Sequence, residues 1–209
     1  MINIDFHTHT HHSYDSRMDP MRILTLARER GLNAIVINDH DTIKGGLEAQ
    51  KINPYKDLQV IVGAEIKTDV GDITGIFLKE EVTARKQSEV IAEIKRQGGI
   101  VILNHPYVHH KLSEINYSGI DFIEGYNGRT DQHRNDLAIE LARKENKPFI
   151  SGSDAHTYSE VANCYTTFEE YIPGSIGAPI DQHYRRSAFS SIEISKLIKA
   201  SKKETSAST

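Results

Sequence analysis

Short apolar runs that alternate with helical patterns constrain the fold of this 209-residue chain more than any other feature. Such runs of β-branched and aromatic residues are typical of buried strands. Strands that alternate with helices indicate βαβ units and a mainly parallel sheet, closed as a barrel or open, and about seven such units fit this length. We expect strands at Ile2–Phe6, Ala34–Ile37, Leu58–Val62, Ile73–Leu78, Ile100–Leu103, Phe122–Ile123 and Phe149–Ile150.

The segments between these runs carry helix signals. Asp19 and Pro20 suit the N-cap and the first position of a helix that Gly31 ends. Asp41 and Thr42 precede another helical segment, and we assign Asp41 mainly the N-cap role there. Two further helices are expected across Ala84–Gln97 and His133–Lys144.

Length and composition indicate one compact α/β domain over residues 1–198. Residues 171–186 contain two prolines and two glycines and are expected to form an irregular connection. Residues 188–198 are expected to form a strand that leads into a short helix. Residues 199–209 are rich in Lys, Ser and Thr, which predicts a flexible tail.

Charge and cysteine content narrow the functional classes. A formal net charge of -4 gives no broad basic field, so no obligate nucleic-acid partner is expected. The sequence shows no signal-peptide pattern and no run near the ~18 apolar residues of a membrane span, so no membrane association is expected. Because Cys164 is the single cysteine, we expect a soluble protein of the reducing cytoplasm, with its oligomeric state left open.

Polar clusters follow five of the predicted strands. In a barrel of parallel strands all C-terminal ends open onto one face, where loops converge to make active sites. We therefore expect five separate clusters to meet at this face. They are His7-Thr8-His9, Asn38-Asp39-His40-Asp41, Gly63-Ala64-Glu65, Asn104-His105-Pro106 and Ser151-Gly152-Ser153-Asp154-Ala155-His156.

The histidines within these clusters indicate a metal centre. Of eleven histidines, four fall within residues 7–12. His7 and His9 are two residues apart at a strand end, so their side chains point the same way and can bind one cation. Asp154 and His156 repeat this spacing, and Glu65 could bridge two cations through its two oxygens. Imidazole and carboxylate ligands without thiolate suit Zn, Mn or Fe.

Other side chains on the same face have two interpretations each. His40 either binds metal or is oriented by its acidic neighbours, and His105 either points into the mouth or belongs to a simple turn before proline. Arg129 is either a phosphate ligand, because its fork matches phosphoryl oxygens, or a solvated charge. Weaker phosphate candidates are Arg185, Arg186 and His183, while His11, His12, His109 and His110 are expected at the rim.

Taken together, these motifs resemble the polymerase and histidinol phosphatase (PHP) superfamily. The resemblance implies a distorted (β/α)7 TIM-like barrel with the metal site at the C-terminal face of the strands. It also implies phosphoesterase activity with two or three divalent metal ions. The matching motifs, in the family's order, are His7-Thr8-His9 with Ser13 and Asp15, Asn38-Asp39-His40-Asp41-Thr42, Gly63-Ala64-Glu65-Ile66, His105-Pro106 and Gly152-Ser153-Asp154-Ala155-His156.

The resemblance also implies three groups of metal ligands. Glu65 would belong to the first group and bridge to the second. By the family's pattern the groups are His7, His9, Glu65 and Asp154; Glu65 and His105; and Asp15, His40 and His156.

One departure from the family's pattern concerns the second metal. Phosphatase members often carry a histidine in the strand near residues 71–75, where this chain has Thr74 or a neighbour. Three outcomes are open: Glu80 or Glu81 substitutes, the second site is weak, or only two metals bind.

We therefore predict a phosphoesterase that hydrolyses a phosphate ester of a small molecule or nucleotide. Metal-activated hydroxide would attack phosphorus in line while the cations neutralise charge on the phosphoryl oxygens. Proton transfer would fall to Asp41, His40 or His156, and Arg129 would bind the substrate phosphate. Two alternatives remain: a non-catalytic PHP module that binds a phosphorylated ligand or partner, and a nuclease acting on single-stranded ends.

Overall fold

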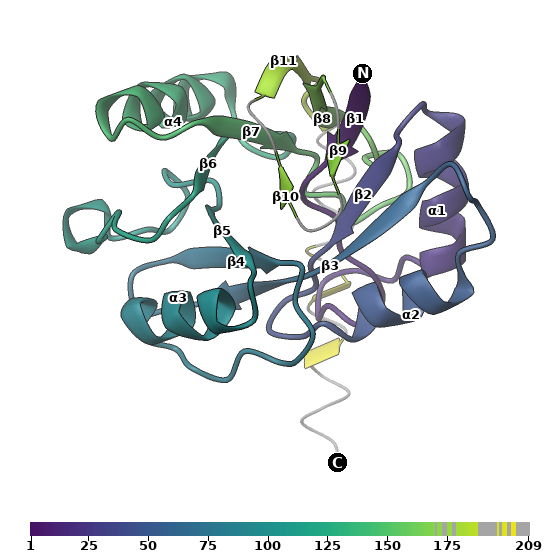
Figure 1. Ribbon diagram of the computed structural model, residues 1–209, viewed down its shortest axis with the longest axis horizontal. Helices are drawn as coiled ribbons and strands as arrows, with labels where there is room; N and C mark the ends of the chain where they lie inside the picture. Colours follow the sequence, from purple (N-terminus) through teal and green to yellow (C-terminus); the bar gives the residue numbers. More distant parts are fainter. Residues whose placement is uncertain are drawn as a thin grey trace.

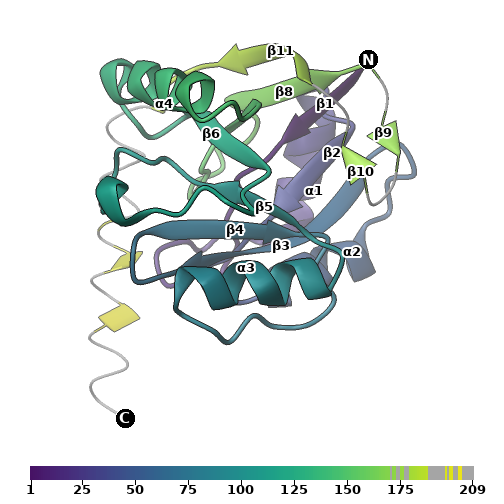
Figure 2. The same cartoon turned by 60° about the vertical axis from the view of Figure 1, so that its left-hand side comes forward.

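The computed structural model describes residues 1–169, 171–172, 175–176, 179–187, 196, 198–199 and 202–203. A nine-stranded sheet curls into a nearly closed, TIM-like barrel, and the helices lie on its outside (Figures 1 and 2). The predicted α/β barrel class is therefore confirmed. Among the described residues, no helix combines the length and the apolar character needed to cross a membrane.

The elements follow one another in the expected alternation for most of the chain. In order they are β1 (Ile2–Asp5), α1 (Pro20–Glu29), β2 (Ala34–Ile37), α2 (Lys44–Ile52), β3 (Gln59–Lys67), β4 (Asp72–Ile76), α3 (Gln87–Arg96), β5 (Ile100–Leu103), a 3-10 turn (Leu112–Glu114), β6 (Phe122–Asn127), α4 (Gln132–Lys144), β7 (Phe149–Gly152), β8 (Cys164–Phe168), β9 (Tyr171–Ile172), β10 (Ser175–Ile176) and β11 (Pro179–Tyr184).

All seven predicted strands are confirmed, as are the three helices predicted with explicit positions. At the start of α1, the Asp19 side chain accepts a hydrogen bond from Arg22 N, and Pro20 occupies the first turn. Gly31 follows the helix with φ +82°, a left-handed conformation that favours glycine.

The sheet departs from seven uniform βα units. Strand β4 runs antiparallel to both β3 and β5, because residues 68–71 form a tight hairpin rather than a helical crossover. The hairpin also lengthens β3 to Lys67, so Glu65 lies inside this strand, opposite Thr74, and not after it. The described residues contain four α-helices, and the expected count of seven units is not observed there.

The predicted N-cap role of Asp41 is wrong. Helix α2 has Ile43 at its N-cap position without a side-chain cap, while the Glu81 carboxylate accepts hydrogen bonds from Ile43 N and Thr42 Oγ1. The φ of Asp41 is +58°, and its Oδ1 accepts from Lys67 N at 3.3 Å. The left-handed backbone thus directs this carboxylate toward β3 and away from the helix.

The last part of the chain is more regular than its composition predicted. Residues 164–168 form β8, which pairs antiparallel with β1, and residues 179–184 form β11, which pairs with β8. The expected irregular connection over 171–186 is therefore wrong for β11. Most of residues 188–209, where we expected a strand, a short helix and a tail, lies outside the described residues, so the domain boundary at residue 198 stays a prediction.

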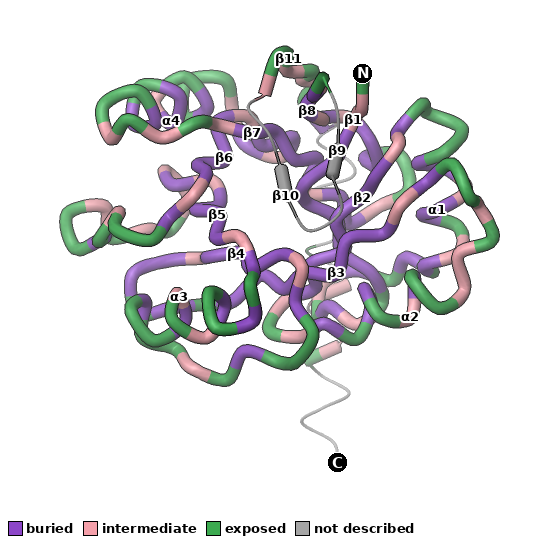
Figure 3. The backbone as a smooth tube through the Cα atoms, viewed as in Figure 1, coloured by how far each residue is buried: buried purple, intermediate pink, exposed green. Residues whose placement is uncertain are grey.

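The interior of the barrel is filled by side chains from successive strands. Alternation places Ala34 and Val36 of β2 inside, and Ile35 and Ile37 outside against α1 and α2. Other interior residues are Ile4, Ile61, Ile76, Ile102, Phe122, Ile150 and Phe168. Figure 3 shows this pattern as buried strands surrounded by helices whose outer faces are exposed.

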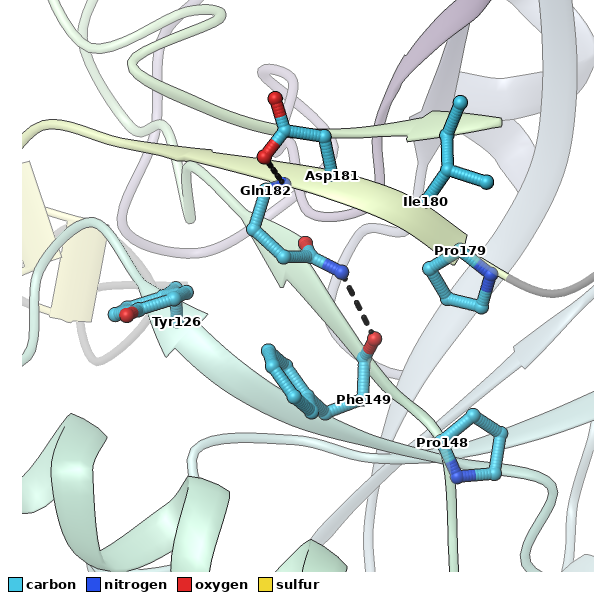
Figure 4. Close-up of a pocket in the computed structure, with 7 residues that line it drawn as sticks. All are labelled: Tyr126, Pro148, Phe149, Pro179, Ile180, Asp181 and Gln182. Carbon is cyan, nitrogen blue, oxygen red and sulfur yellow. Dashed lines mark hydrogen bonds between the residues drawn. The ribbon is translucent and has the colours of Figure 1, made fainter. Parts of the chain in front are cut away.

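Two kinds of contact close the barrel along the seam where the two ends of the sheet meet. At the mouth, Thr8 and Ala155 form a parallel bridge, with His9 N donating to Ala155 O at 3.0 Å and Ala155 N donating to His7 O at 3.2 Å. Deeper in the seam, side chains make the connection: Gln182 Nε2 of β11 donates to Phe149 O of β7 at 3.0 Å (Figure 4). The hollow of about 450 Å³ in Figure 4 lies along this seam, next to Tyr126 and Phe149.

Candidate metal centre

A cavity of about 380 Å³ opens at the mouth of the barrel. Its lining combines two kinds of side chain: residues of types that can bind metal ions, and positively charged residues. The metal-ligating residues in the lining are Asp15, His40, Glu65, Asp72, His105, Asp154 and His156. The cations are Arg129, Arg134, Arg186 and Lys196.

The first candidate ligand group contributes Glu65 and Asp154 to the cavity lining, while its two histidines, His7 and His9, are buried outside that lining. His7 Nε2 is 3.3 Å from Glu65 Oε2 and 3.6 Å from Asp154 Oδ1. His9 Nε2 is 3.4 Å and 3.3 Å from the same two oxygens. Two imidazole nitrogens and two carboxylate oxygens thus surround one point.

These distances fit a divalent metal ion. Ligand atoms about 2.0–2.1 Å from a tetrahedral Zn²⁺ lie about 3.3–3.4 Å from one another, which matches the observed separations. The Nε2 atoms of His7 and His9 are also buried without a hydrogen-bond partner among the described residues. Buried polar atoms are normally paired, and a metal ion would supply the partner that these nitrogens lack.

Acidic neighbours orient both histidines. His7 Nδ1 lies 2.9 Å from Glu124 Oε1, and His9 Nδ1 lies 3.0 Å from Ser13 Oγ, which itself donates to Asp39 at 2.6 Å. An Nδ1–H that donates to such a partner leaves the Nε2 lone pair free for the metal. The sequence analysis did not select Glu124, although it directly follows the expected strand Phe122–Ile123; in the structure it lies inside β6.

Glycine at position 152 permits this close packing. A Cβ there would lie 2.4 Å from His7 Cβ and 2.5 Å from Glu124 Oε1. Below it, the buried Asp5 carboxylate accepts hydrogen bonds from the backbone nitrogens of His7, Ser153 and Ala162. Asp5 therefore ties the first strand to the loop that carries Asp154.

The second ligand group uses a residue that the sequence analysis did not select. Glu65 Oε1 is 3.0 Å from His105 Nε2, and the carboxylate of Asp72 joins them within one cluster. Because β4 runs antiparallel, its first residue, and not its last, lies at the mouth. Thr74 is buried two residues farther along, where its Oγ1 accepts from the amides of Asn38 and Asn104.

The two glutamates considered as substitutes lie elsewhere. Glu81 holds the start of α2, as described above, and Glu80 pairs with Arg96 on the surface. Among the described residues, Asp72 is thus the group that stands where the family often has histidine.

The third group is centred on Asp15. Its carboxylate oxygens lie 3.4 Å from His40 Nε2 and 3.1 Å from His156 Nε2. His9 also falls within one cluster with these two histidines. Tyr14 stacks on the His40 ring with centroids 4.4 Å apart and covers it from the solvent side.

The protonation of the metal-free cluster shows how strongly it attracts positive charge. Burial is the largest influence on each group and opposes ionisation, but the surrounding charges outweigh it at Glu65, whose pKa is held well below its usual value by His7 and His40. Against the same burial, Glu65 raises the pKa of His105 to about 9 and, with Asp15, that of His40 to about 10. Metal cations bound at these positions would displace the protons of His40 and His105.

For two other groups, the pKa shift disfavours the charged form. Burial, with the adjacent His156 and His40, lowers the pKa of His9 to about 3, so His9 is a neutral imidazole ready to bind metal. Burial and the charge of Glu65 raise the pKa of Asp72, as expected for a carboxylate that faces another carboxylate without a cation between them.

Two of the candidate ligands have a strained backbone conformation. His105 has φ +22° and Asp154 has φ +52°, both in the region that favours glycine. Residues held in such conformations cost about 1–3 kcal/mol each and cluster at functional sites. Both side chains are directed toward the Glu65 cluster by this backbone.

The remaining predicted residues divide between the cavity and other places. Arg129 lines the cavity, with its guanidinium 3.2 Å from the buried carboxylate of Glu160. Asp41 is not part of the lining and pairs instead with Arg85 at 3.4 Å. Of the weaker candidates, Arg186 lines the cavity, whereas His183 stacks on Tyr165.

The four histidines expected at the rim are found in different settings. His109 lines the cavity, and His110 accepts a hydrogen bond from Asp72 N at 2.9 Å. His11 and His12 face Glu48 on α2, away from the ligand groups described above.

Comparison with known proteins supports the assignment of a family. A family model described as PHP-associated matches residues 132–180. An uncharacterized protein of Methanocaldococcus jannaschii, MJ1587, is 32% identical over 161 residues, which cover 69% of this chain and 93% of that protein.

Solved structures share the fold at lower sequence identity. One is a two-domain protein of Bacteroides vulgatus described as containing a predicted PHP-like metal-dependent phosphoesterase, with a TM-score of 0.66 and 19% identity. The match covers 79% of this chain and 58% of that longer one. Another is an amidohydrolase of Chromobacterium violaceum with bound sulfate, with a TM-score of 0.63, 15% identity and coverage of 94% and 96% of the two chains. By its barrel, its ordered motifs and its relatives, this chain belongs to the PHP superfamily.

Proposed function

We propose that this protein is a metal-dependent phosphoesterase that hydrolyses a phosphate ester of a small molecule or nucleotide. The observation that carries the proposal is the juxtaposition, in one cavity, of three ligand groups and four cationic side chains. Hydrolysis of a phosphate ester uses both kinds of group, because cationic side chains bind the anionic phosphoryl oxygens and metal ions activate the water that attacks phosphorus. The Bacteroides vulgatus protein, described as containing a predicted PHP-like metal-dependent phosphoesterase, supports the same reaction class.

Divalent ions held by these groups would lower the pKa of a coordinated water and neutralise charge on the phosphoryl oxygens. Mn, Zn and Fe all suit this set of imidazoles and carboxylates. The first ion would be held by His7, His9, Glu65 and Asp154, the second by Glu65, His105 and Asp72, and the third by Asp15, His40 and His156. The protein's own contribution is to fix these ligands before substrate arrives.

Arg129 is the proposed phosphate-binding residue. Its ion pair with Glu160 fixes the guanidinium at the cavity wall. The same Glu160 carboxylate accepts from the backbone nitrogens of His156 and Thr157 at 2.9 Å and 2.8 Å. One buried glutamate thus positions both the arginine and the loop that carries a metal ligand, which sets their relative distance.

The structure reduces the candidates for proton transfer. Asp41 lies outside the cavity lining with its carboxylate on Arg85 and Lys67 N, so we leave it out of the proposed catalytic groups. His40 and His156 line the cavity and remain candidates.

The two alternatives are weighed differently by the structure. The missing histidine near Thr74 favours the non-catalytic module, whereas the carboxylate of Asp72, in one cluster with Glu65 and His105, supports the enzyme. A nuclease acting on single-stranded ends gains support from the exposed Tyr14 and the cations at the mouth, since aromatic and basic side chains bind unpaired strands.

The test is a substrate panel on purified protein loaded in turn with Mn²⁺, Zn²⁺ and Fe²⁺. A phosphomonoester, a phosphodiester, a short single-stranded DNA and an amide substrate would separate the reaction classes. We expect hydrolysis of a phosphate ester that His9→Ala abolishes and that the exposed control His133→Ala retains. A folded, metal-loaded protein that cleaves none of the phosphate esters would refute the proposal.

A further inference from the structure

A separate set of metal-ligating side chains lies on the surface, outside the cavity. His11 and His12 stand on the loop after β1, and Glu48 stands on α2. His12 Nε2 is 2.7 Å from Glu48 Oε2, and His11 Nε2 is 3.5 Å from the same oxygen. None of the three lines the cavity of the metal centre.

His12 Nε2 and Glu48 Oε2 form a hydrogen bond at 2.7 Å, and the second imidazole adds a third ligand atom to this pair. The two adjacent imidazoles lie with centroids 4.4 Å apart and both direct Nε2 at one carboxylate oxygen. All three ligand atoms fall within 4.8 Å of one another, and the separations bracket the ~3.3 Å expected around a four-coordinate ion. The side chains are 27–41% exposed, which leaves room for water to complete the coordination.

The backbone that presents the two histidines is fixed. His11 N donates to Met18 O at 2.9 Å, and His12 N donates to Thr10 Oγ1 at 3.1 Å. Thr10 Oγ1 in turn donates to Asp39, the carboxylate that also accepts from Ser13. The imidazoles therefore need little rearrangement to bind an ion, which lowers the entropic cost of binding.

We propose that His11, His12 and Glu48 form an additional surface site for a divalent transition-metal ion. Two imidazoles and one carboxylate favour Zn²⁺, Ni²⁺, Co²⁺ or Cu²⁺ over Mg²⁺ or Ca²⁺, which prefer oxygen ligands alone. An ion here cross-links α2 to the loop that carries Asp15. It therefore holds in place a ligand of the metal centre without taking part in that centre.

The experiment counts bound Zn²⁺ after equilibrium dialysis of the full chain, with folding checked by circular dichroism. Glu48→Gln and His12→Ala are each expected to bind one ion fewer than the parent protein, and the exposed control His133→Ala is expected to match it. His9→Ala is expected to lose an ion from the metal centre while retaining the surface ion.

A second measurement locates the ion. Diamagnetic Zn²⁺ should shift the imidazole NMR signals of His12 in the parent protein and leave them unshifted in Glu48→Gln, whereas the signals of His9 should shift in both proteins. Equal ion counts in the parent, Glu48→Gln and His12→Ala would overturn the proposal and identify the contact as a surface ion pair. This outcome is independent of whether phosphate esters are hydrolysed.

Discussion

Replacing Glu124 by glutamine tests how the protein prepares its first metal-binding group. Glu124 Oε1 faces His7 Nδ1 at 2.9 Å, while Oε2 accepts from His105 N at 2.9 Å and from Asn127 Nδ2 at 3.0 Å. All of these neighbours act as donors. Glutamine offers one oxygen and one NH₂ group, so it cannot accept on both sides.

Each orientation of the new amide has a defined cost. If NH₂ faces His7, the imidazole must accept at Nδ1 and carry its proton on Nε2, which then cannot bind metal. Loss of such an orienting partner lowers metal affinity about 10- to 100-fold, or about 1.4–2.7 kcal/mol. If NH₂ faces His105 N instead, a buried donor loses its acceptor and the free energy of unfolding falls by about 1–3 kcal/mol.

Two measurements cover both orientations of Glu124→Gln: calorimetric titration with Mn²⁺, and urea unfolding in the presence of a chelator. The exposed Glu89→Gln serves as the matched control. Metal affinity within about twofold of the parent, together with stability within about 0.5 kcal/mol, would refute the argument that Glu124 sets the state of His7.

Four further results are expected. Asp72→Ala should bind one metal ion fewer in ion counting, and an unchanged count would remove Asp72 from the proposed ligands. Thr74→Val should keep the ion count, but its free energy of unfolding in urea should fall by about 1–3 kcal/mol, because two buried side-chain amides lose an acceptor. Without metal, the melting temperature should fall from neutral pH to about pH 10. Folding raises the pKa of His105 to about 9 and that of His40 to about 10, so their protonation stabilises the folded state fully below the unfolded value of 6.5, and this stabilisation is lost as pH rises through the folded values. A rise in melting temperature over that range would contradict the argument. Gln182→Ala should lower the free energy of unfolding by about 1–3 kcal/mol, measured by urea unfolding, because the β7 carbonyl and two hydroxyls lose their partner; unchanged stability would mean that the seam does not depend on this side chain.

The strands and the ends of the parallel strands could be predicted because each carries a local signal. A continuous apolar run identifies a buried strand wherever it pairs, and a polar cluster directly after it identifies the mouth. His7, His9 and Asp154 satisfy both conditions. The structure brings these three residues together, and their role as metal ligands stays a prediction.

Asp72 and Glu124 could not be located in that way, for two different reasons. Asp72 precedes its strand, and it reaches the mouth only because β4 is reversed by the hairpin at residues 68–71. The sequence Asp69-Val70-Gly71-Asp72 holds a turn signal that would have indicated this reversal. Glu124 directly follows the short apolar run Phe122–Ile123, but it stands there as a single acidic residue before Gly125 and without a neighbouring histidine, so the signal is weak.

Strands β8 and β11 were missed because their pairing is long-range. Burial alternates along Cys164–Phe168, but the residue types do not, because two threonines are adjacent. The pairing partner of this segment is β1, at the other end of the chain. Pro179 and the glycines before it favoured an irregular segment by composition, but β8 supplies a partner that composition cannot reveal.

The bridge between Thr8 and Ala155 has a consequence for the order of events in the cell. The first metal-binding group draws on both sides of this bridge, and Asp5 reaches Ser153 across 148 positions of sequence. While the chain is being synthesised, His7 and His9 are present long before Asp154, so the complete set of proposed ligands exists only after β7 has docked against the start of the chain. We therefore expect metal uptake to be a late step of maturation, and a bound ion would slow the reopening of the ring by joining the loop after β1 to the loop after β7.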